Sequence, residues 1–462
     1  FRDLLRQRLA QSAPDRVGGL HRRAAAWYEA QIARAVEPQD AVGAVQAAVE
    51  HTRAGAGDEA VASLLDAHAD VLWLVGSHAW LFETLADLPA DALRSYPRAT
   101  VYHALGKLLA GRFEGIERAL AWAEAGLDHV PDEDTRAALS GVIAAIRSYA
   151  AFVCGEAGDA QRWAERALGL LPSDHHVWRG AAAMSLGDAH IARGDLVAAT
   201  GAYEEALEAN RAAHNAINML IVGLKLADTQ MRRGFLHRAM ESCRWQMDLA
   251  RVHGLAETPR GAAIQAVRGD VLREWNRLDE AERALERAVE WAVRGTHRVA
   301  QTWVHLAWIG LRFSRRDWEG MEAAIADVAR MARAADLPVW VGSRLTAWRL
   351  RAQIVRGRKD TAFLQRAARF VEEKGLSDAE PNLAYLWEEA YMALARLRIA
   401  QERGDAAMGL LDRLHRAGLR HEFEVRILLS ALEVIDEERE LLVHCTLAGL
   451  RAEVEGEIVA MW

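Results

Sequence analysis

Hydrophobic and polar positions along the chain alternate with the period of amphipathic helices, and the helices come in pairs. Three turns mark the pairing most clearly, at Gly194, Gly234 and Asn276. Each is followed by a helix with alanine at a fixed offset, and the turns are 40 and 42 residues apart. A recurrence of about 34 to 47 residues built from paired helices is typical of a helical repeat array.

From Asp132 onward the predicted helix pairs become regular. They are 135–154 with 160–171, 177–193 with 197–211, 217–233 with 236–252, 260–275 with 278–293, 299–314 with 318–335, 339–356 with 361–373, and 383–403 with 406–417. Helices at 422–434 and from 438 onward are expected to finish the series. No alternating strand pattern lasts, so we predict an all-α fold: a tetratricopeptide-like, right-handed superhelix of about eight helix pairs with no sheet.

The stretch before Asp132 is less regular. A helix at 1–9 is expected to end at Pro14 and the Gly18-Gly19 pair, because both residue types disfavour a helix interior. The further helices predicted there are 20–35, 40–52, 59–74, 79–86, 96–110 and 114–129.

The composition fits an ordered helical protein and gives no footprint for nucleic acid. Of the 462 residues, 51% are hydrophobic, and 57 basic against 65 acidic residues give a formal net charge of −8. The last 42 residues hold ten acids and three arginines, the opposite of what a DNA-binding module needs.

Compartment and metal content follow from a few residues. Cys154, Cys243 and Cys445 are odd in number and far apart, which favours a reducing cytoplasm over a disulfide framework. The longest apolar run, 71–82, is too short to span a bilayer. No secretory signal opens the chain, and Phe1 indicates that the natural N-terminus lies further upstream. No metal-ligand spacing of His or Cys is present, so we expect no metal site.

The opening of the chain resembles one particular family. Residues 20–29 read Leu-His-Arg-Arg-Ala-Ala-Ala-Trp-Tyr-Glu, and 85–89 read Leu-Ala-Asp-Leu-Pro. Leu-Ala-Gly-Arg-Phe follows at 109–113, and Trp-Asn-Arg-Leu-Asp-Glu-Ala-Glu stands at 275–282. In this order and spacing they resemble the MalT-like regulators, the large ATP-binding LuxR-type transcription activators. The resemblance covers essentially the whole chain.

The resemblance implies a fragment of such a regulator. No Gly-x-x-x-x-Gly-Lys-Ser/Thr phosphate loop occurs, and no C-terminal helix-turn-helix is recognised. The implied parts are a helical arm at 1–131 and an inducer-sensing superhelix at 132–462. In the family that superhelix binds a small-molecule inducer, and with ATP this drives self-association on promoters. We therefore expect no cofactor in this fragment, ATP only in the missing domain, and no enzymatic activity. The expected partner is a sugar or other polar metabolite, without direct binding of nucleic acid or membrane.

Candidate ligand-binding residues lie on the first helix of each pair, which lines the inner surface in repeats of this kind. Asp188, Asp228 and Asp270 occupy one equivalent position. One turn further along stand Met231, Arg232, Arg273 and Glu274. A row of inward carboxylates with neighbouring arginines would hold a polyol or sugar by several hydrogen bonds. Alternatively, these residues cap helices or bridge adjacent ones.

Tryptophan is the second signal, with 16 in the chain and many in the second half. Trp303 and Trp340 lie on, or at the start of, inner helices, where a flat ring would stack on a ligand. Alternatively, the rings fill gaps between helices. We predict a pocket between Asp188 and Arg351, with Arg351 among its residues. The competing function is a peptide- or protein-binding scaffold of repeats without a small ligand.

Overall fold

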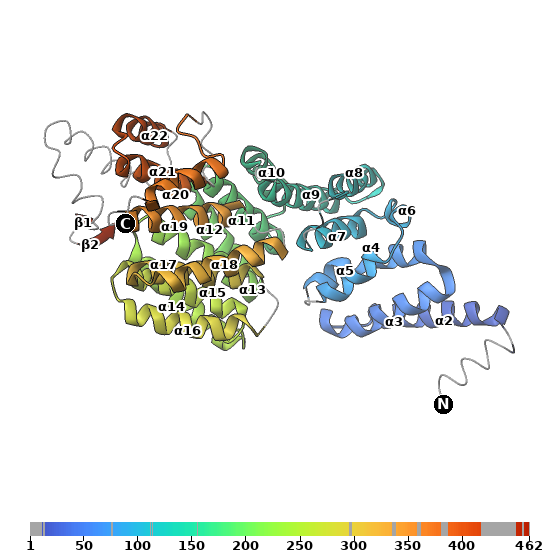
Figure 1. The fold of residues 1–462 in the computed structure, drawn as a ribbon. Coiled ribbons are helices and arrows are strands. Elements are labelled where there is room, and N and C mark those ends of the chain that lie inside the picture. Colours follow the sequence, from blue (N-terminus) through green and yellow to red (C-terminus); the bar gives the residue numbers. More distant parts are fainter. Residues whose placement is uncertain are drawn as a thin grey trace. The chain divides into compact units, whose positions relative to one another are not determined.

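The structure is a computed structural model of the chain, and Figure 1 shows its fold. It describes residues 12, 14–74, 77–110, 112, 114–154, 156–294, 298–334, 339–357, 362–379, 387–416, 450–454 and 457–461. The expected helices at 1–9, at 422–434 and from 438 to 449 therefore lie outside the described residues.

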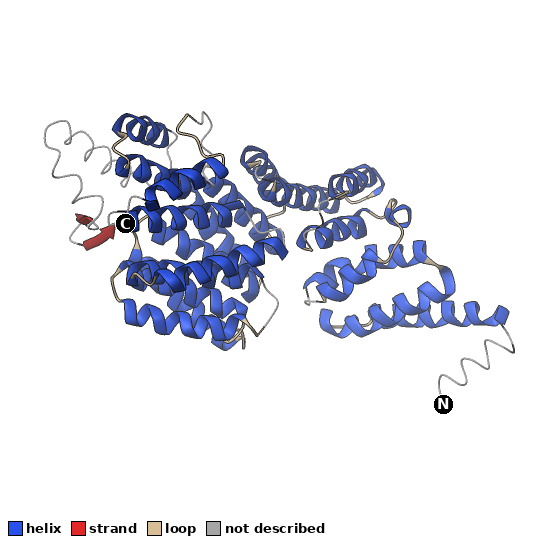
Figure 2. Cartoon of the chain, in the orientation of Figure 1, coloured by secondary structure: helices blue, strands red, loops and turns tan. Residues whose placement is uncertain are grey.

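Helices make up almost all of the described chain (Figure 2). The first group is α2 (Pro14–Ile32), α3 (Pro38–Ala56), α4 (Asp58–Leu74), α5 (His78–Ala86), α6 (Ala90–Leu93), α7 (Pro97–Leu109), α8 (Ile116–Gly126) and the short 3₁₀ helix η1 (Leu127–His129). The paired helices that follow are α9 (Glu133–Val153), α10 (Ala157–Leu170), α11 (His176–Ala192), α12 (Leu196–Ala212), α13 (Ala216–Arg232), α14 (Leu236–Val252), α15 (Pro259–Glu274), α16 (Leu278–Ala292), α17 (Arg298–Arg315), α18 (Trp318–Ala334), α19 (Val339–Gly357), α20 (Ala362–Glu373), α21 (Glu388–Ala400) and α22 (Gly404–Arg416). The all-α, tetratricopeptide-like fold class is confirmed.

The expectation of no sheet is wrong in one place. Strands β1 (Leu450–Val454) and β2 (Glu457–Met461) form an antiparallel hairpin, where the sequence interpretation continued a helix. Leu450, Ala452 and Val454 alternate with Arg451 and Glu453, which is compatible with a strand, but the strong helix pattern before this segment masked the signal.

The predicted break at Gly18-Gly19 is also wrong, because α2 begins at Pro14 and runs through both glycines. Proline is tolerated in the first turn of a helix, where its missing N–H costs nothing. The close packing between α2 and α3 restricts Gly55 of α3, whereas a Cβ on Gly18 or Gly19 would meet no atom closer than 3.6 Å. A Cβ on Gly55 would lie 2.9 Å from the backbone nitrogen of Arg22 and 3.1 Å from the carbonyl oxygen of Gly18.

The predicted turns between paired helices adopt the left-handed backbone conformation. Gly194 and Gly234 have φ of 83° and 82°, and Asn276 has φ of 57°. After each turn residue, a backbone N–H donates to the carbonyl five residues earlier, for example Asp195 to His190 at 3.0 Å. This hydrogen bond satisfies a carbonyl that the helix end would otherwise leave without a donor. The Asp195 side chain then caps α12 by accepting from the N–H of Ala198 at 2.8 Å.

The chain divides into two compact units. Unit 1 is Phe1–Ala150 with Glu165–Trp178, and unit 2 is Ala151–Ala164 with Arg179–Trp462. This division follows packing, whereas the predicted boundary at residue 131 follows the family resemblance and stays a prediction.

In unit 1, a cluster of rings ties the helices together. Trp73 of α4 stacks on Trp178 with ring centroids 5.9 Å apart and contacts Tyr102 and Phe82 at 5.9 and 6.0 Å. The Tyr102 hydroxyl donates to Asp70 at 2.7 Å.

The helix α9 is the one described helix long and apolar enough to cross a membrane, and 56% of its most apolar window is buried within the protein.

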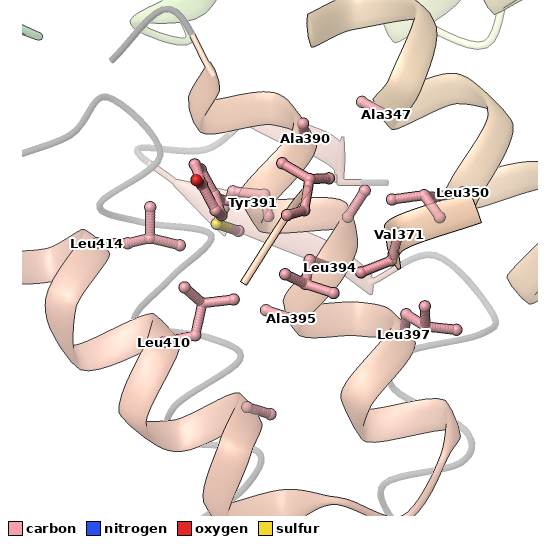
Figure 3. Packing of buried hydrophobic residues seen from close by; sticks show 14 of the residues in the cluster. Ala347, Leu350, Val371, Ala390, Tyr391, Leu394, Ala395, Leu397, Leu410 and Leu414 are labelled. Carbon is pink, nitrogen blue, oxygen red and sulfur yellow. The ribbon is translucent and has the colours of Figure 1, made fainter. Parts of the chain in front are cut away.

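In unit 2, each pair buries an apolar stripe against its neighbours. The cluster drawn in Figure 3 joins Leu350 of α19, Val371 of α20, Leu394 of α21 and Leu410 of α22. Leu196, at the start of α12, belongs to the same cluster. The early and late repeats of unit 2 therefore meet, which shows that the row of helices curves round on itself.

Candidate ligand-binding site

The first helix of each pair forms a continuous inner row in unit 2. The helix α13 packs on α15, α15 on α17, α17 on α19, and α19 on α21. Small residues precede the three aspartates and set their direction. A Cβ on Gly187 would lie 2.4 Å from the Tyr203 ring, and one on Gly269 would lie 2.7 Å from Leu285. Those positions face the second helix of the pair, so the following aspartate, about 100° further round, points along the inner row.

Asp188 forms a buried ion pair with a repeat neighbour. Its carboxylate accepts from Lys225 Nζ at 2.6 Å and from the Tyr203 hydroxyl at 2.6 Å. Asp188 is only 2% exposed. Burial, and then the charge of Asp188, raises the pKa of Tyr203 well above its usual value, so this hydroxyl stays a donor. Asp188 is thus fully engaged within the protein.

Asp228 lies at the centre of a wider network. It pairs with Arg232 Nε at 2.6 Å on its own helix and with Arg344 Nη2 at 3.3 Å. Arg344 in turn donates through Nε to Glu389 at 3.2 Å. Asp228 and Arg344 are 116 residues apart in sequence. Their contact shows that α13 and α19 present side chains to the same interior.

Asp270 and Arg273 pair within α15. Arg273 Nε lies 3.3 Å from Asp270, and its Nη2 lies 2.5 Å from Glu274. Burial raises the pKa of Asp270, although Arg273 and Arg344 partly offset this rise. Burial alone would lower the pKa of Arg273, but Glu274 and Asp270 raise it overall. The arginine therefore stays charged beside its acids.

Two tryptophans lie beside these guanidinium groups. Arg344 lies over the Trp303 ring at 5.3 Å from its centroid. Arg273 and Arg351 lie over the Trp348 ring at 5.8 and 5.2 Å. An aromatic face attracts a cation placed over it, and the stacking also holds the planar guanidinium in one orientation.

We call this group the inner charge cluster, and it draws on the first helices α13, α15, α19 and α21. Its members are Asp228, Arg232, Asp270, Arg273, Glu274, Arg344, Arg351, Glu389 and Arg396. Charged side chains of both signs, held by hydrogen bonds and stacked on rings, are suited to binding a polar ligand by several simultaneous hydrogen bonds.

The structure brings together most of the predicted site residues. Asp228, Arg232, Asp270, Arg273 and Arg351 all belong to the inner charge cluster. Asp188 lies in its own ion pair with Lys225. The alternative interpretation, in which the aspartates bridge adjacent helices, holds for Asp188 and Asp228. Asp188 pairs with Lys225, and Asp228 pairs with Arg344.

Three further predicted residues have other surroundings. Met231 packs against an apolar cluster that includes residues of α15 and α16. Trp303 packs against apolar clusters and also lies under Arg344, so the gap-filling alternative describes it, while its stacking on a ligand stays a prediction. The side chain of Trp340 lies outside the described residues.

Sequence reasoning missed Lys225, Tyr203, Arg344, Glu389 and Arg396. A signal existed for Arg344, because it stands seven residues before Arg351 on a helix predicted to be inner. Residues seven apart share one helix face. For Lys225 and Tyr203, the pairing with Asp188 depends on contacts between helices, which local spacing does not report.

The fold and the inner row define a helical repeat protein of the tetratricopeptide class. The family model of the MalT-like TPR region matches residues 141–434, a span that contains every described residue of the inner charge cluster. The chain belongs to this family.

Curated relatives agree. The chain is 28% identical over 288 residues to the HTH-type transcriptional regulator MalT of Serratia proteamaculans (strain 568), covering 62% of this chain and 30% of that protein. It is 28% identical over 260 residues to the MalT of Yersinia pestis (strain Pestoides F), covering 55% of this chain and 28% of that protein. The chain thus spans under a third of the length of these relatives.

Among solved structures, one similar protein is a signal transduction ATPase with numerous domains and a tetratricopeptide repeat sensor, from Pyrococcus horikoshii. The match has a TM-score of 0.45 and 12% identity, and it covers 93% of this chain and 57% of that one.

Proposed function

We propose that this chain is the ligand-sensing region of a MalT-like transcription activator and binds a small polar inducer at the inner surface of unit 2. The observation that carries the proposal is the inner charge cluster. Replacing buried ion pairs by well-packed apolar residues is often neutral or stabilising, so a repeat protein does not need such a network for its stability. A ligand that forms hydrogen bonds with these charged side chains would explain why the interior beside Trp303 and Trp348 is charged.

Membership in the MalT-like family supports the regulatory part of the proposal. Relatives carry the name HTH-type transcriptional regulator. In the proposed full-length protein, ATP binding and DNA binding belong to the family's other domains, the full-length protein self-associates, and it works in the cytoplasm. The chain alone, with a net charge of −8, is then expected neither to hydrolyse ATP nor to retard promoter DNA in a gel-shift assay.

The direct test is a thermal-shift screen of sugars and polar metabolites, since a ligand that binds only the folded state raises the melting temperature. A compound that raises it is then titrated by calorimetry against Asp228→Asn and Trp303→Phe. Asn keeps the shape of the aspartate side chain, and Phe keeps a smaller aromatic ring in place of the indole. Loss of a charged hydrogen bond at Asp228 should weaken binding by roughly 10- to 100-fold.

The matched control is Asp327→Asn, a half-exposed carboxylate on α18 that pairs with Arg330. It should bind as the wild type does. Unchanged affinity in both Asp228→Asn and Trp303→Phe would contradict the proposed site. If the chain instead bound peptides while no small compound raised the melting temperature, the scaffold function would replace the sensor function.

A further inference from the structure

Two aromatic rings on α20 hold positive charges that are separate from the inner charge cluster. The helices α19 and α20 pack side by side (Figure 1). Arg356 of α19 and Arg366 of α20 lie over the Phe363 ring, at 4.1 and 4.0 Å from its centroid. An aromatic face attracts a cation, and the stacking also holds a planar guanidinium in one orientation. The ring therefore fixes one cation from each helix.

A second ring repeats this arrangement further along α20. Arg349 of α19 and Lys374, directly after α20, lie over the Phe370 ring at 5.6 and 5.8 Å from its centroid. Phe363 and Phe370 are seven residues apart, so they share one face of the helix and are about 10 Å apart along its axis. We call this group the basic surface. Its members are Arg349, Arg356, Phe363, Arg366, Phe370 and Lys374.

The four cations of the basic surface have no acid paired with them. None of their side chains forms an ion pair with a residue in the described part of the chain. Arg366 and Lys374 are exposed, whereas the two α19 cations are half-buried. Two acids of α20, Glu372 and Glu373, are also exposed. They lie one turn from Arg369, which is for that reason not counted in the basic surface.

Other second helices of unit 2 pair their exposed arginines with acids. In α10, α12, α14 and α18 an arginine pairs with an acid three residues earlier. These pairs are Arg162–Asp159, Arg211–Glu208, Arg251–Asp248 and Arg330–Asp327. The described residues of α20 form no pair of this kind, although the chain has 65 acidic against 57 basic residues. The basic surface is therefore a local exception on an acidic protein.

The geometry of the basic surface suits carboxylates supplied by another molecule. A guanidinium stacked on a ring still presents N–H donors at its edge, and these match the two oxygens of a carboxylate. The two pairs of cations are about 10 Å apart, as their rings are. Three residues of an extended chain, or two turns of a helix, place two carboxylates at this spacing.

Nucleic acid and membrane fit this surface less well. The helix α20 has 12 residues, so it is about 18 Å long, and duplex DNA of that length carries about ten phosphate charges. Four cations do not balance ten phosphates on a chain with a net charge of −8, beside Glu372 and Glu373. A membrane surface would favour exposed apolar side chains for insertion. Among the described residues of α19 and α20, no large apolar side chain is exposed.

From these observations we infer that the basic surface of α19 and α20 is a docking site for an acidic polypeptide segment of a partner protein. Carboxylates of that segment pair with the cations at both rings at once. The inference goes beyond the proposed function and does not depend on it, because no residue of the basic surface belongs to the inner charge cluster.

The test is fluorescence anisotropy of a labelled oligoglutamate peptide titrated with the purified chain. The peptide should bind, its affinity should fall as salt is added, and oligoglutamine of the same length should not bind. Arg356→Gln and Arg366→Gln should each weaken binding by about 2- to 5-fold, because exposed charge pairs are individually weak. Replacing all four cations with glutamine should weaken it by roughly 20-fold or more.

Two further variants separate docking from general attraction by charge. Phe363→Leu leaves the net charge unchanged but removes the ring that holds two guanidinium groups, so it should weaken binding by about 2- to 5-fold. The matched control is Arg238→Gln, which removes an exposed arginine that lies over the Phe235 ring on another part of unit 2. It should bind the peptide as the wild type does. Melting temperatures of the single variants should stay close to the wild-type value.

Three outcomes would overturn the inference. One is the absence of oligoglutamate binding to the wild type. Another is equal weakening by Arg238→Gln and Arg366→Gln, or no weakening by Phe363→Leu, since either would mark a general charge effect. The third is tighter binding of short duplex DNA or of phosphatidylserine vesicles than of oligoglutamate, which would assign the surface to nucleic acid or membrane. Each of these outcomes leaves the proposed sensor function as it stands.

Discussion

Trp73 in unit 1 and Trp303 in unit 2 have different kinds of neighbours. In unit 1, Trp73 packs against the rings of Trp178, Tyr102 and Phe82. In unit 2, Trp303 and Trp348 pack beneath the guanidinium groups of arginines. The first arrangement gains stability by removing apolar surface from water. The second arrangement holds charged groups in a largely buried interior, where an unpaired charge costs free energy. A ligand that pairs with such a charge would therefore contribute most to stability at this place.

The largest expected effect comes from removing the cation that joins the charged network. Arg344→Ala takes away the group between Asp228 and Glu389, both largely buried. Breaking a buried pair in this way costs about 3–5 kcal/mol. Urea denaturation should show the loss, and hydrogen exchange should place it in α13, α19 and α21. Arg330→Ala, on the exposed surface, should change stability by less than about 0.5 kcal/mol. Similar stabilities for the two variants would mean that the network contributes nothing.

The corresponding change in unit 1 is Trp178→Ala. Trp178 is 5% exposed and stacks on Trp73, so its removal should cost about 3 kcal/mol. Because the lost term is apolar, the cost should not fall as salt is added. The control is Trp27→Ala, since Trp27 is 58% exposed. An equal loss for both tryptophans would contradict the described burial.

A smaller effect is expected at the ion pair of Asp188. Lys225→Met keeps the apolar stem of the side chain and removes its charge. Of the two donors to the buried Asp188 carboxylate described above, the Tyr203 hydroxyl then remains. The expected cost is about 2 kcal/mol, as for a charged hydrogen bond. Combining Lys225→Met with Asp188→Asn should recover part of it, since the uncompensated charge is then gone. No recovery in the double variant would show that the two side chains act independently.

A loss of similar size, with a smaller effect in its control, tests the close approach of paired helices. Gly187→Ala places a Cβ 2.4 Å from the buried Tyr203 ring and should cost about 1–3 kcal/mol through overpacking. Gly201→Ala, in α12 with open space around its Cβ, should instead stabilise the protein by about 0.5–1 kcal/mol. Thermal denaturation of the two variants distinguishes packing from helix propensity, because both replace a helical glycine with alanine. A stabilised Gly187→Ala protein would contradict the described contact.

Helix pairing and turn position could be predicted from the sequence, because both depend on residues that lie only a few positions apart. Gly194, Gly234 and Asn276 were predicted as turn residues, and all three have positive φ. Arg316 and Glu402 adopt the same left-handed conformation with φ of 59°, although neither residue type is typical of it. There the geometry of the repeat imposes a conformation that the residue itself disfavours.

The sequence by itself determined the repeat class, the row of aspartates and the arginines beside them. Only the tertiary structure decided which charges meet. Asp228 and Arg344 lie 116 residues apart, and their contact exists because the inner row curves back on itself. That curvature accumulates from small rotations between successive pairs, set by the packing of many side chains at once. A local pattern of residues records each helix and its apolar face, but not the sum of those rotations, and so it does not show which acid engages which arginine.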